Sequence, residues 1–182
     1  MMRPVPLCVL SSSAPPRVEH GHDPELCVQI GSLTKPLTGT LLVRLAAAGA
    51  LELDDPLERF LPVPAGTGIT LRHLATHTSG LPRLPPGLDR RDPYVPFDAA
   101  ALDALVRRLD TLVTGAPGER EEYSNFGYAV LGSALAAAGG APYEHLLTEF
   151  VLSPLDITQV TSAPPPERRL VARGLLGRPL RP

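Results

Sequence analysis

Residues 30–39 read Ile30-Gly31-Ser32-Leu33-Thr34-Lys35-Pro36-Leu37-Thr38-Gly39, a stretch in which apolar residues alternate with hydroxyl groups and one lysine. Leucines recur at intervals of four from Leu33 to Leu45, which predicts a helix that begins near Ser32 and ends at Gly49. Pro36 is compatible with this helix because the first four N–H groups of a helix have no partner within it.

Ser32 and Lys35 lie three residues apart, so they would share one face at the start of that helix. A serine hydroxyl is a poor nucleophile until a neighbouring base takes its proton, and a neutral lysine is one group that can do so. The spacing therefore predicts a nucleophile beside a base. The same pattern also arises by chance, with the serine as a helix cap and the lysine in solvent.

A second polar motif, Tyr123-Ser124-Asn125, precedes an alanine-rich helix that is predicted over residues 126–138. A phenol close to Lys35 could serve as the base or relay a proton to a leaving group. The Asn125 amide could orient the lysine and a substrate amide. The plainer alternative is a buried tyrosine followed by a serine that caps the helix.

The remaining pattern predicts a mainly helical chain with a short N-terminal β hairpin. Residues 5–10 and 26–30 are expected to form its two strands, joined by a turn-rich segment. Further helices are expected after three capping signals: Thr70 up to Gly80, Asp98 up to Gly115, and Pro142 onward.

Length and charge limit the classes of function. The chain has 182 residues, enough for one domain with a hydrophobic core. Its net charge of −2 gives no indication of nucleic acid or an anionic membrane as a partner. No apolar run approaches the about 18 residues of a membrane span, and no signal peptide is recognised, so a cytoplasmic location is expected.

The histidines do not predict a metal site. His20 and His22 lie in a loop without convincingly placed Cys, Asp or Glu partners, so a solvated loop is expected. His77 could act in catalysis, but it is expected instead to pack and to form a hydrogen bond near the end of a helix.

The motifs together resemble the serine β-lactamase/penicillin-binding-protein superfamily, and in particular its class C β-lactamase-like branch. Similar segments follow the order of that family from about residue 26 to residue 160. These segments are residues 30–35, Leu51-Glu52-Leu53-Asp54-Asp55-Pro56, residues 71–82, Pro117-Gly118-Glu119-Arg120, residues 123–128 and Pro154-Leu155. The resemblance implies an α+β chain with a β-lactamase/transpeptidase-like fold.

The resemblance also implies roles for four residues. Ser32 would be the acylated nucleophile, Lys35 and Tyr123 would share the work of general base and proton relay, and Asn125 would bind the substrate amide. The reaction would be hydrolysis through an acyl-enzyme, with a small ester, an amide or a D-amino-acid peptide as the substrate. No metal or organic cofactor is implied.

One family motif has no counterpart. The third motif, Lys-Thr-Gly or His-x-Gly, does not occur after Asn125. The chain is therefore expected to be a truncated member, with a partial domain at 1–162 and a Pro/Arg-rich tail at 163–182 that leads into a missing part. Its turnover is expected to be weak or absent. Asp156 stands where the family usually has glycine, although aspartate tolerates the left-handed region better than most residues.

A hypothesis of another class stays open at this point. The chain could be a non-catalytic remnant or fragment whose exposed apolar face binds a partner chain.

Overall fold

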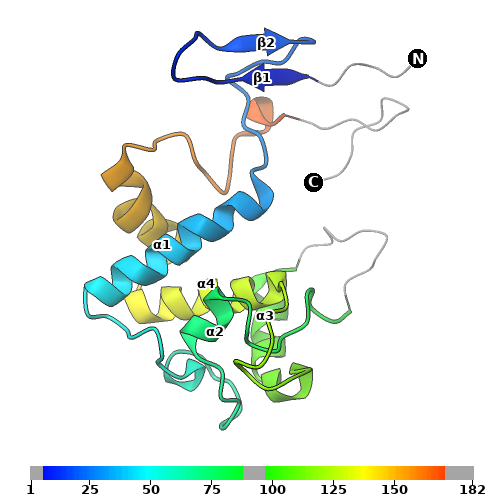
Figure 1. The fold of residues 1–182 in the computed structure, drawn as a ribbon, viewed down its shortest axis with the longest axis vertical. Helices are drawn as coiled ribbons and strands as arrows, with labels where there is room; N and C mark the ends of the chain where they lie inside the picture. Colours follow the sequence, from blue (N-terminus) through cyan, green and yellow to red (C-terminus); the bar gives the residue numbers. More distant parts are fainter. Residues whose placement is uncertain (1–5, 88–96, 171–182) are drawn as a thin grey trace. The chain divides into compact units, whose positions relative to one another are not determined.

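The computed structural model describes residues 6–87 and 97–170. Its contacts divide the chain into two compact units, one formed by Ser32–Val160 and the other by Met1–Gly31 with Thr161–Pro182. Figure 1 shows that the first unit is helical and that both described strands belong to the second. No helix in the described ranges is both long and apolar enough to cross a membrane.

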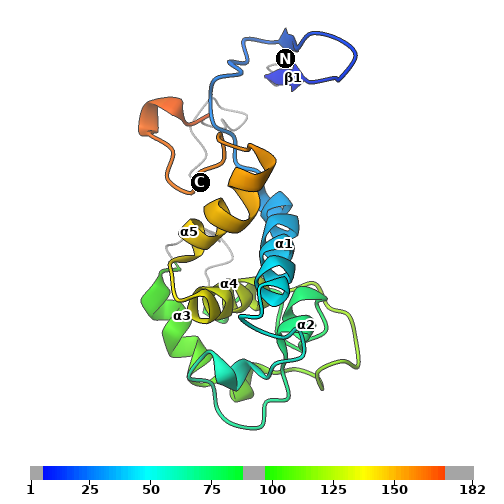
Figure 2. The same cartoon turned by 90° about the vertical axis from the view of Figure 1, so that its left-hand side faces the viewer.

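The helical unit is organised around two long helices. Helix α1 spans Thr34–Ala47 and helix α4 spans Asn125–Gly139, and the two contact one another. The short helix α2, Leu71–Ala75, packs on α4, while α5, Tyr143–Leu147, contacts both α1 and α4. Figures 1 and 2 show from two directions how these helices surround α4.

The core of this unit is built from leucines of several helices around one aromatic ring. Phe126 at the start of α4 has 0% of its surface exposed. The buried side chains of α1, α2 and α4 include Leu41, Leu42, Leu45, Leu71, Leu74, Phe126, Val130, Leu131, Ala134 and Leu135. Burial of this apolar surface is the main driving force that holds the helices together.

Capping residues set where the helices start, as the sequence predicts. The Thr70 side chain accepts from the His73 N–H, Asp98 accepts from the Ala101 N–H at 2.8 Å, and Ser124 accepts from the Gly127 N–H at 2.8 Å. These bonds satisfy N–H groups that have no partner within the helix. The predicted helix after Ser32 is also present, with a 3-10 turn over Gly31–Leu33 leading into α1.

Two predicted helices are shorter than the sequence suggested. Helix α3 covers only Ala99–Val106, because Arg108 leaves the helical region and a 3-10 turn, Leu109–Leu112, follows. This break allows Leu109 to be fully buried. Helix α2 ends at Ala75 rather than near Gly80, because the backbone turns into the left-handed region at His77.

The end of the helical unit contains further short turns. A π-helical turn at Thr148–Leu152 follows α5, and a 3-10 turn at Ser153–Leu155 comes next. Asp156 then adopts φ = 54°, in the left-handed region that aspartate tolerates better than most residues. Two other 3-10 turns lie at Leu57–Arg59 and Pro166–Arg168.

The hairpin is present, but its second strand was predicted at the wrong place. Strand β1 spans Leu7–Val9 and pairs antiparallel with β2, Arg17–Glu19, with Cys8 opposite Val18. The turn between them contains Pro15 and Pro16, which have no N–H to donate and so interrupt a ladder. The segment 26–30 forms only an isolated parallel bridge, between Cys27 and Arg169.

Two glycines with similar φ angles provide a test of the close packing around Gly80. Gly80 has φ = 71°, and a Cβ there would overlap the carbonyl group of Gly115, whereas Gly49 has φ = 75° and open space around it. We expect Gly49→Ala to lower the free energy of unfolding by about 1–2 kcal/mol through backbone strain alone. Gly80→Ala should lower it by about 3 kcal/mol or more, because the overlap adds to that strain.

Equilibrium unfolding in urea would measure both values. Equal losses in the two variants would contradict the close approach of Gly80 to Gly115.

Candidate active site

The structure brings together the four residues that the sequence singles out. The Ser32 Oγ and the Tyr123 Oη lie 2.6 Å apart. The Lys35 Nζ donates to the Ser32 Oγ at 3.3 Å and to the Asn125 Oδ1 at 2.7 Å. A hydroxyl, a phenol, an ammonium group and a carboxamide thus form one connected network, and the role of each stays a prediction.

The network forms where the N-terminal ends of α1 and α4 meet. Ser32 lies in the 3-10 turn before α1, and Lys35 is the second residue of that helix. Asn125 is the first residue of α4, and Tyr123 lies two residues earlier. Ser32 is exposed while the other three are half-buried, so the nucleophile faces solvent and its partners are held by the fold.

Positive charge stabilises the ionised form of Tyr123. The hydrogen bond with Lys35 lowers the pKa of the Tyr123 phenol most, and the hydrogen bond with Ser32 is the second cause. The charges of Lys35 and Arg83 act in the same direction. The Lys35 Nζ lies 4.8 Å from the centroid of the Tyr123 ring, and the Arg83 Cζ lies 5.3 Å from it. Burial, in contrast, raises the pKa of the neighbouring Tyr128.

Ser124 ties the start of α4 to two other segments. It is only 1% exposed, and its Oγ donates to the Pro82 carbonyl at 2.7 Å while accepting from the Gly127 N–H. Its own N–H donates to the Nδ1 of His77 at 3.1 Å. Ser124 thus caps α4, as the plainer alternative for this motif had it, and the same bonds fix its neighbours Tyr123 and Asn125.

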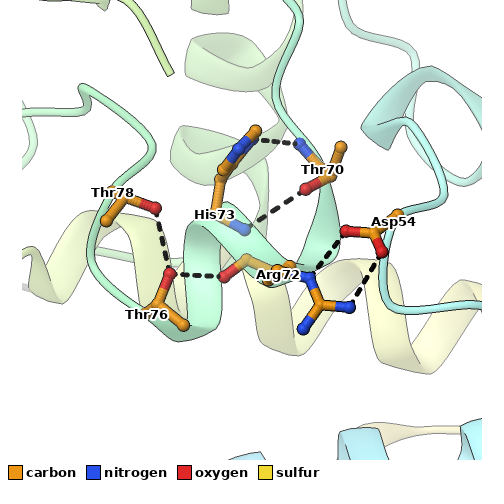
Figure 3. Close-up of polar contacts among 6 residues, drawn as sticks. All are labelled: Asp54, Thr70, Arg72, His73, Thr76 and Thr78. Carbon is orange, nitrogen blue, oxygen red and sulfur yellow. Dashed lines mark hydrogen bonds and ion pairs between the residues drawn. The ribbon is translucent and has the colours of Figure 1, made fainter. Parts of the chain in front are cut away.

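Figure 3 shows the polar contacts that hold α2 and the residues directly after it, the segment in which His77 lies. A capping box links Thr70 with His73, and the Arg72 guanidinium contacts both carboxylate oxygens of Asp54 at 2.7 and 2.8 Å. This hydrogen bonding lowers the pKa of Asp54. The Thr76 hydroxyl donates to the Arg72 carbonyl at 2.9 Å and lies 2.9 Å from the Thr78 hydroxyl. The backbone on both sides of residue 77 is therefore restrained.

His77 packs and forms a hydrogen bond after the end of a helix, as the sequence predicts. Its ring centroid lies 4.6 Å from that of Tyr123 and 4.9 Å from that of Tyr128. Burial is the main cause that lowers the pKa of the His77 imidazole, and the charge of Lys35 is the second. The sequence did not predict that its partner would be Ser124, the residue between Tyr123 and Asn125.

In the part of the chain that the structure describes, His, Cys, Asp and Glu do not form a group of three or more that could hold a metal ion.

The electrostatics of the site lead to a prediction about Tyr123. We expect Lys35→Met to raise the pKa of the Tyr123 phenol, because it removes the strongest stabilising interaction of the phenolate. Arg83→Gln should raise it less, because Arg83 acts only through its charge. NMR titration of tyrosine labelled with ¹³C at Cζ measures both shifts. A larger shift in the Arg83 variant would contradict this assignment of causes.

Comparison with known proteins identifies relatives of this chain. The model of a family described as Beta-lactamase matches residues 13–180. The chain is 40% identical over 153 residues to the D-alanyl-D-alanine-carboxypeptidase/endopeptidase AmpH of Escherichia coli (strain K12), a match that covers 79% of this chain and 39% of AmpH. It is 34% identical over 149 residues to esterase EstB of Burkholderia gladioli, covering 70% of this chain and 36% of EstB.

A solved structure shows the same fold. The crystal structure of a β-lactamase/D-alanine carboxypeptidase from Yersinia pestis matches with a TM-score of 0.72 and 32% identity, covering 84% of this chain and 48% of that one. The chain thus spans less than half the length of these relatives. The predicted superfamily and the β-lactamase/transpeptidase-like fold are confirmed. Because the family model extends over most of the 182 residues, this chain belongs to the β-lactamase family of serine hydrolases.

Proposed function

We propose that this chain carries out acyl transfer with Ser32 as the nucleophile, forming an acyl-enzyme that water then hydrolyses. The observation that carries the proposal is the 2.6 Å separation of the Ser32 Oγ and the Tyr123 Oη beside the Lys35 ammonium group. A nucleophile within hydrogen-bonding distance of a base, with the base oriented by a third group, is the geometry that covalent catalysis needs.

Tyr123 is the group that we propose as the base. The Lys35 Nζ donates to both the Ser32 Oγ and the Asn125 Oδ1, so in this arrangement the lysine acts as a donor. The phenolate of Tyr123 takes the proton of Ser32 as the Oγ bonds to the substrate carbonyl carbon. The resulting phenol then gives that proton to the leaving group as the bond to the acyl carbon breaks.

Deacylation uses the same groups in the reverse direction. Tyr123, again a phenolate, takes a proton from water as the water oxygen attacks the acyl carbon, and the proton then passes to the Ser32 Oγ as the ester bond breaks. Lys35 keeps its charge throughout and stabilises the negative charge that develops near Tyr123. Tyr123 and Lys35 therefore act in both acylation and deacylation.

Asn125 and the backbone of Ser32 would bind the substrate carbonyl groups. The Asn125 Oδ1 accepts from Lys35, so the NH₂ half of this amide is the part that can donate to a substrate amide carbonyl. The N–H of Ser32, at the start of a helix, would donate to the oxyanion of the tetrahedral intermediate.

The proposed substrates are small esters, amides and D-amino-acid peptides, because AmpH and EstB are named for peptidase and esterase activities. These reactions share the acyl-enzyme step. The 182 residues contain no Lys-Thr-Gly or His-x-Gly sequence after Asn125, so they do not supply the second oxyanion donor that the resemblance assigns to the strand with this third motif. We therefore propose that these 182 residues by themselves turn over slowly, since loss of one such donor typically costs about 10²–10³ in rate.

The test is covalent labelling of Ser32, read by intact mass. The chain is incubated separately with p-nitrophenyl acetate, benzylpenicillin and a peptide ending in D-Ala-D-Ala. We expect a single adduct whose mass equals the acyl group, because the proposed nucleophile Ser32 lies within hydrogen-bonding distance of Tyr123 and Lys35. Ser32→Ala should abolish it, and Tyr123→Phe should slow its formation by about 10²-fold or more.

Ser153→Ala is the matched control, because Ser153 is an exposed serine in the 3-10 turn after α5 and has no part in the network. It should be acylated at the rate of the unsubstituted chain. An adduct that persists in Ser32→Ala, or a folded chain that forms no adduct with any of the three reagents, would overturn the proposal.

A further inference from the structure

The backbone of His77 is held in an unfavourable conformation. Its φ of 60° lies in the left-handed region, which few residues other than glycine adopt. Hydrogen bonds keep it there: the Thr78 N–H donates to the His73 carbonyl at 2.8 Å, and the Glu122 N–H donates to the His77 carbonyl at 2.7 Å. A strained residue that its surroundings hold in place often marks a functional position.

The side chain of His77 is directed at the segment that carries the base. Its Nδ1 accepts the Ser124 N–H at 3.1 Å, and its ring contacts those of Tyr123 and Tyr128. Because the Nδ1 is an acceptor here, it carries no proton, and the ring must be the neutral tautomer with hydrogen on Nε2. The imidazole therefore fixes the residue that directly follows Tyr123.

We propose that His77 is a positioning residue: as a neutral imidazole it holds the Tyr123–Ser124 backbone so that the phenol stays within reach of Ser32, and on protonation it releases that backbone. The inference deepens the proposed acyl transfer and rests on it for the kinetic effect. The hydrogen bond between His77 and Ser124 can be tested separately.

Charged groups around His77 set the direction of its pH dependence. Lys35 of α1 acts on the His77 imidazole through its charge. The ring of Tyr128 in α4 and that of Tyr123 just before α4 contact the imidazole. Glu121, two residues before Tyr123, also acts on it through its charge. Burial and Lys35 lower the pKa of His77, whereas Glu121 opposes them. The imidazole is thus neutral near neutral pH. Its Nδ1 is protonated, and so stops accepting the Ser124 N–H, only as the pH falls through a pKa below the ordinary one of about 6.5.

Two substitutions separate the acceptor from the ring. In His77→Asn the Oδ1 branches from Cγ as the Nδ1 of histidine does, asparagine tolerates the left-handed region, and the side chain does not titrate. His77→Gly keeps the backbone conformation without strain but removes the acceptor. His145→Asn, at an exposed position of α5, is the matched control for loss of a histidine.

The kinetic readout is the rate of Ser32 acylation by p-nitrophenyl acetate between pH 5 and pH 9. We expect the unsubstituted chain and His145→Asn to lose rate as the pH falls through the titration of His77. His77→Asn should lack that inflection, with a smaller loss at pH 8 than His77→Gly. The latter should be slower by about 10- to 100-fold, because a misplaced base costs rate of this order.

The structural readout is the ¹⁵N–¹H signal of Ser124, followed in the same pH range. It should shift with the pKa of His77 in the unsubstituted chain and should not shift over that range in His77→Asn. This measurement needs no turnover. If the chain is never acylated, the proposed acyl transfer is wrong, and the Ser124 signal still decides whether His77 holds the Ser124 backbone.

Three results would overturn the inference. One is a Ser124 signal that does not follow the titration of His77. Another is an acid inflection that persists unchanged in His77→Asn. The third is a folded His77→Gly variant that is acylated at the original rate. If His77→Gly does not fold, the comparison of His77→Asn with the unsubstituted chain still decides the matter.

Discussion

The structure depends on the burial of one polar residue, Ser124. A buried hydroxyl and a buried N–H each need a hydrogen-bond partner, because an unpaired group loses its interaction with water and gains nothing in return. The partners of Ser124 are the Pro82 carbonyl and the His77 Nδ1, and both residues are far from Ser124 in the sequence. The hydrogen bonds that Ser124 needs therefore fix the loop after α2, the start of α4, and the two side chains next to Ser124 in sequence.

The local part of this arrangement could be predicted from the sequence. The spacing of Ser32 and Lys35 places them on one helix face, and capping preferences indicate Thr70, Asp98 and Ser124 as helix starts. Each of these features is determined by neighbours within four residues in the chain. The approach of Tyr123 to Ser32 is different, because the two are 91 residues apart, and only the resemblance to a family suggested it.

The features that the sequence did not predict all depend on contacts between distant residues. Strand β2, Arg17–Glu19, has a single apolar residue between two charged ones, a weaker strand pattern than 26–30, and its pairing with β1 decides the outcome. The end of α3 is set by burial of Leu109. For His77, the chain showed a histidine near a helix end, but its partner at Ser124 lies 47 residues away. The partner chain and the division at residue 162 stay predictions.

The 91-residue separation of Ser32 and Tyr123 makes acylation a reporter of tertiary docking. Helix α1 can form with Ser32 and Lys35 in register before α4 is in place, because that pair is local. In a molten globule, secondary structure persists while fixed side-chain packing is lost. Such a state would retain the far-ultraviolet circular dichroism of the helices, yet its serine would remain an ordinary alcohol. A covalent adduct on Ser32 therefore counts the molecules in which α1 and α4 have docked.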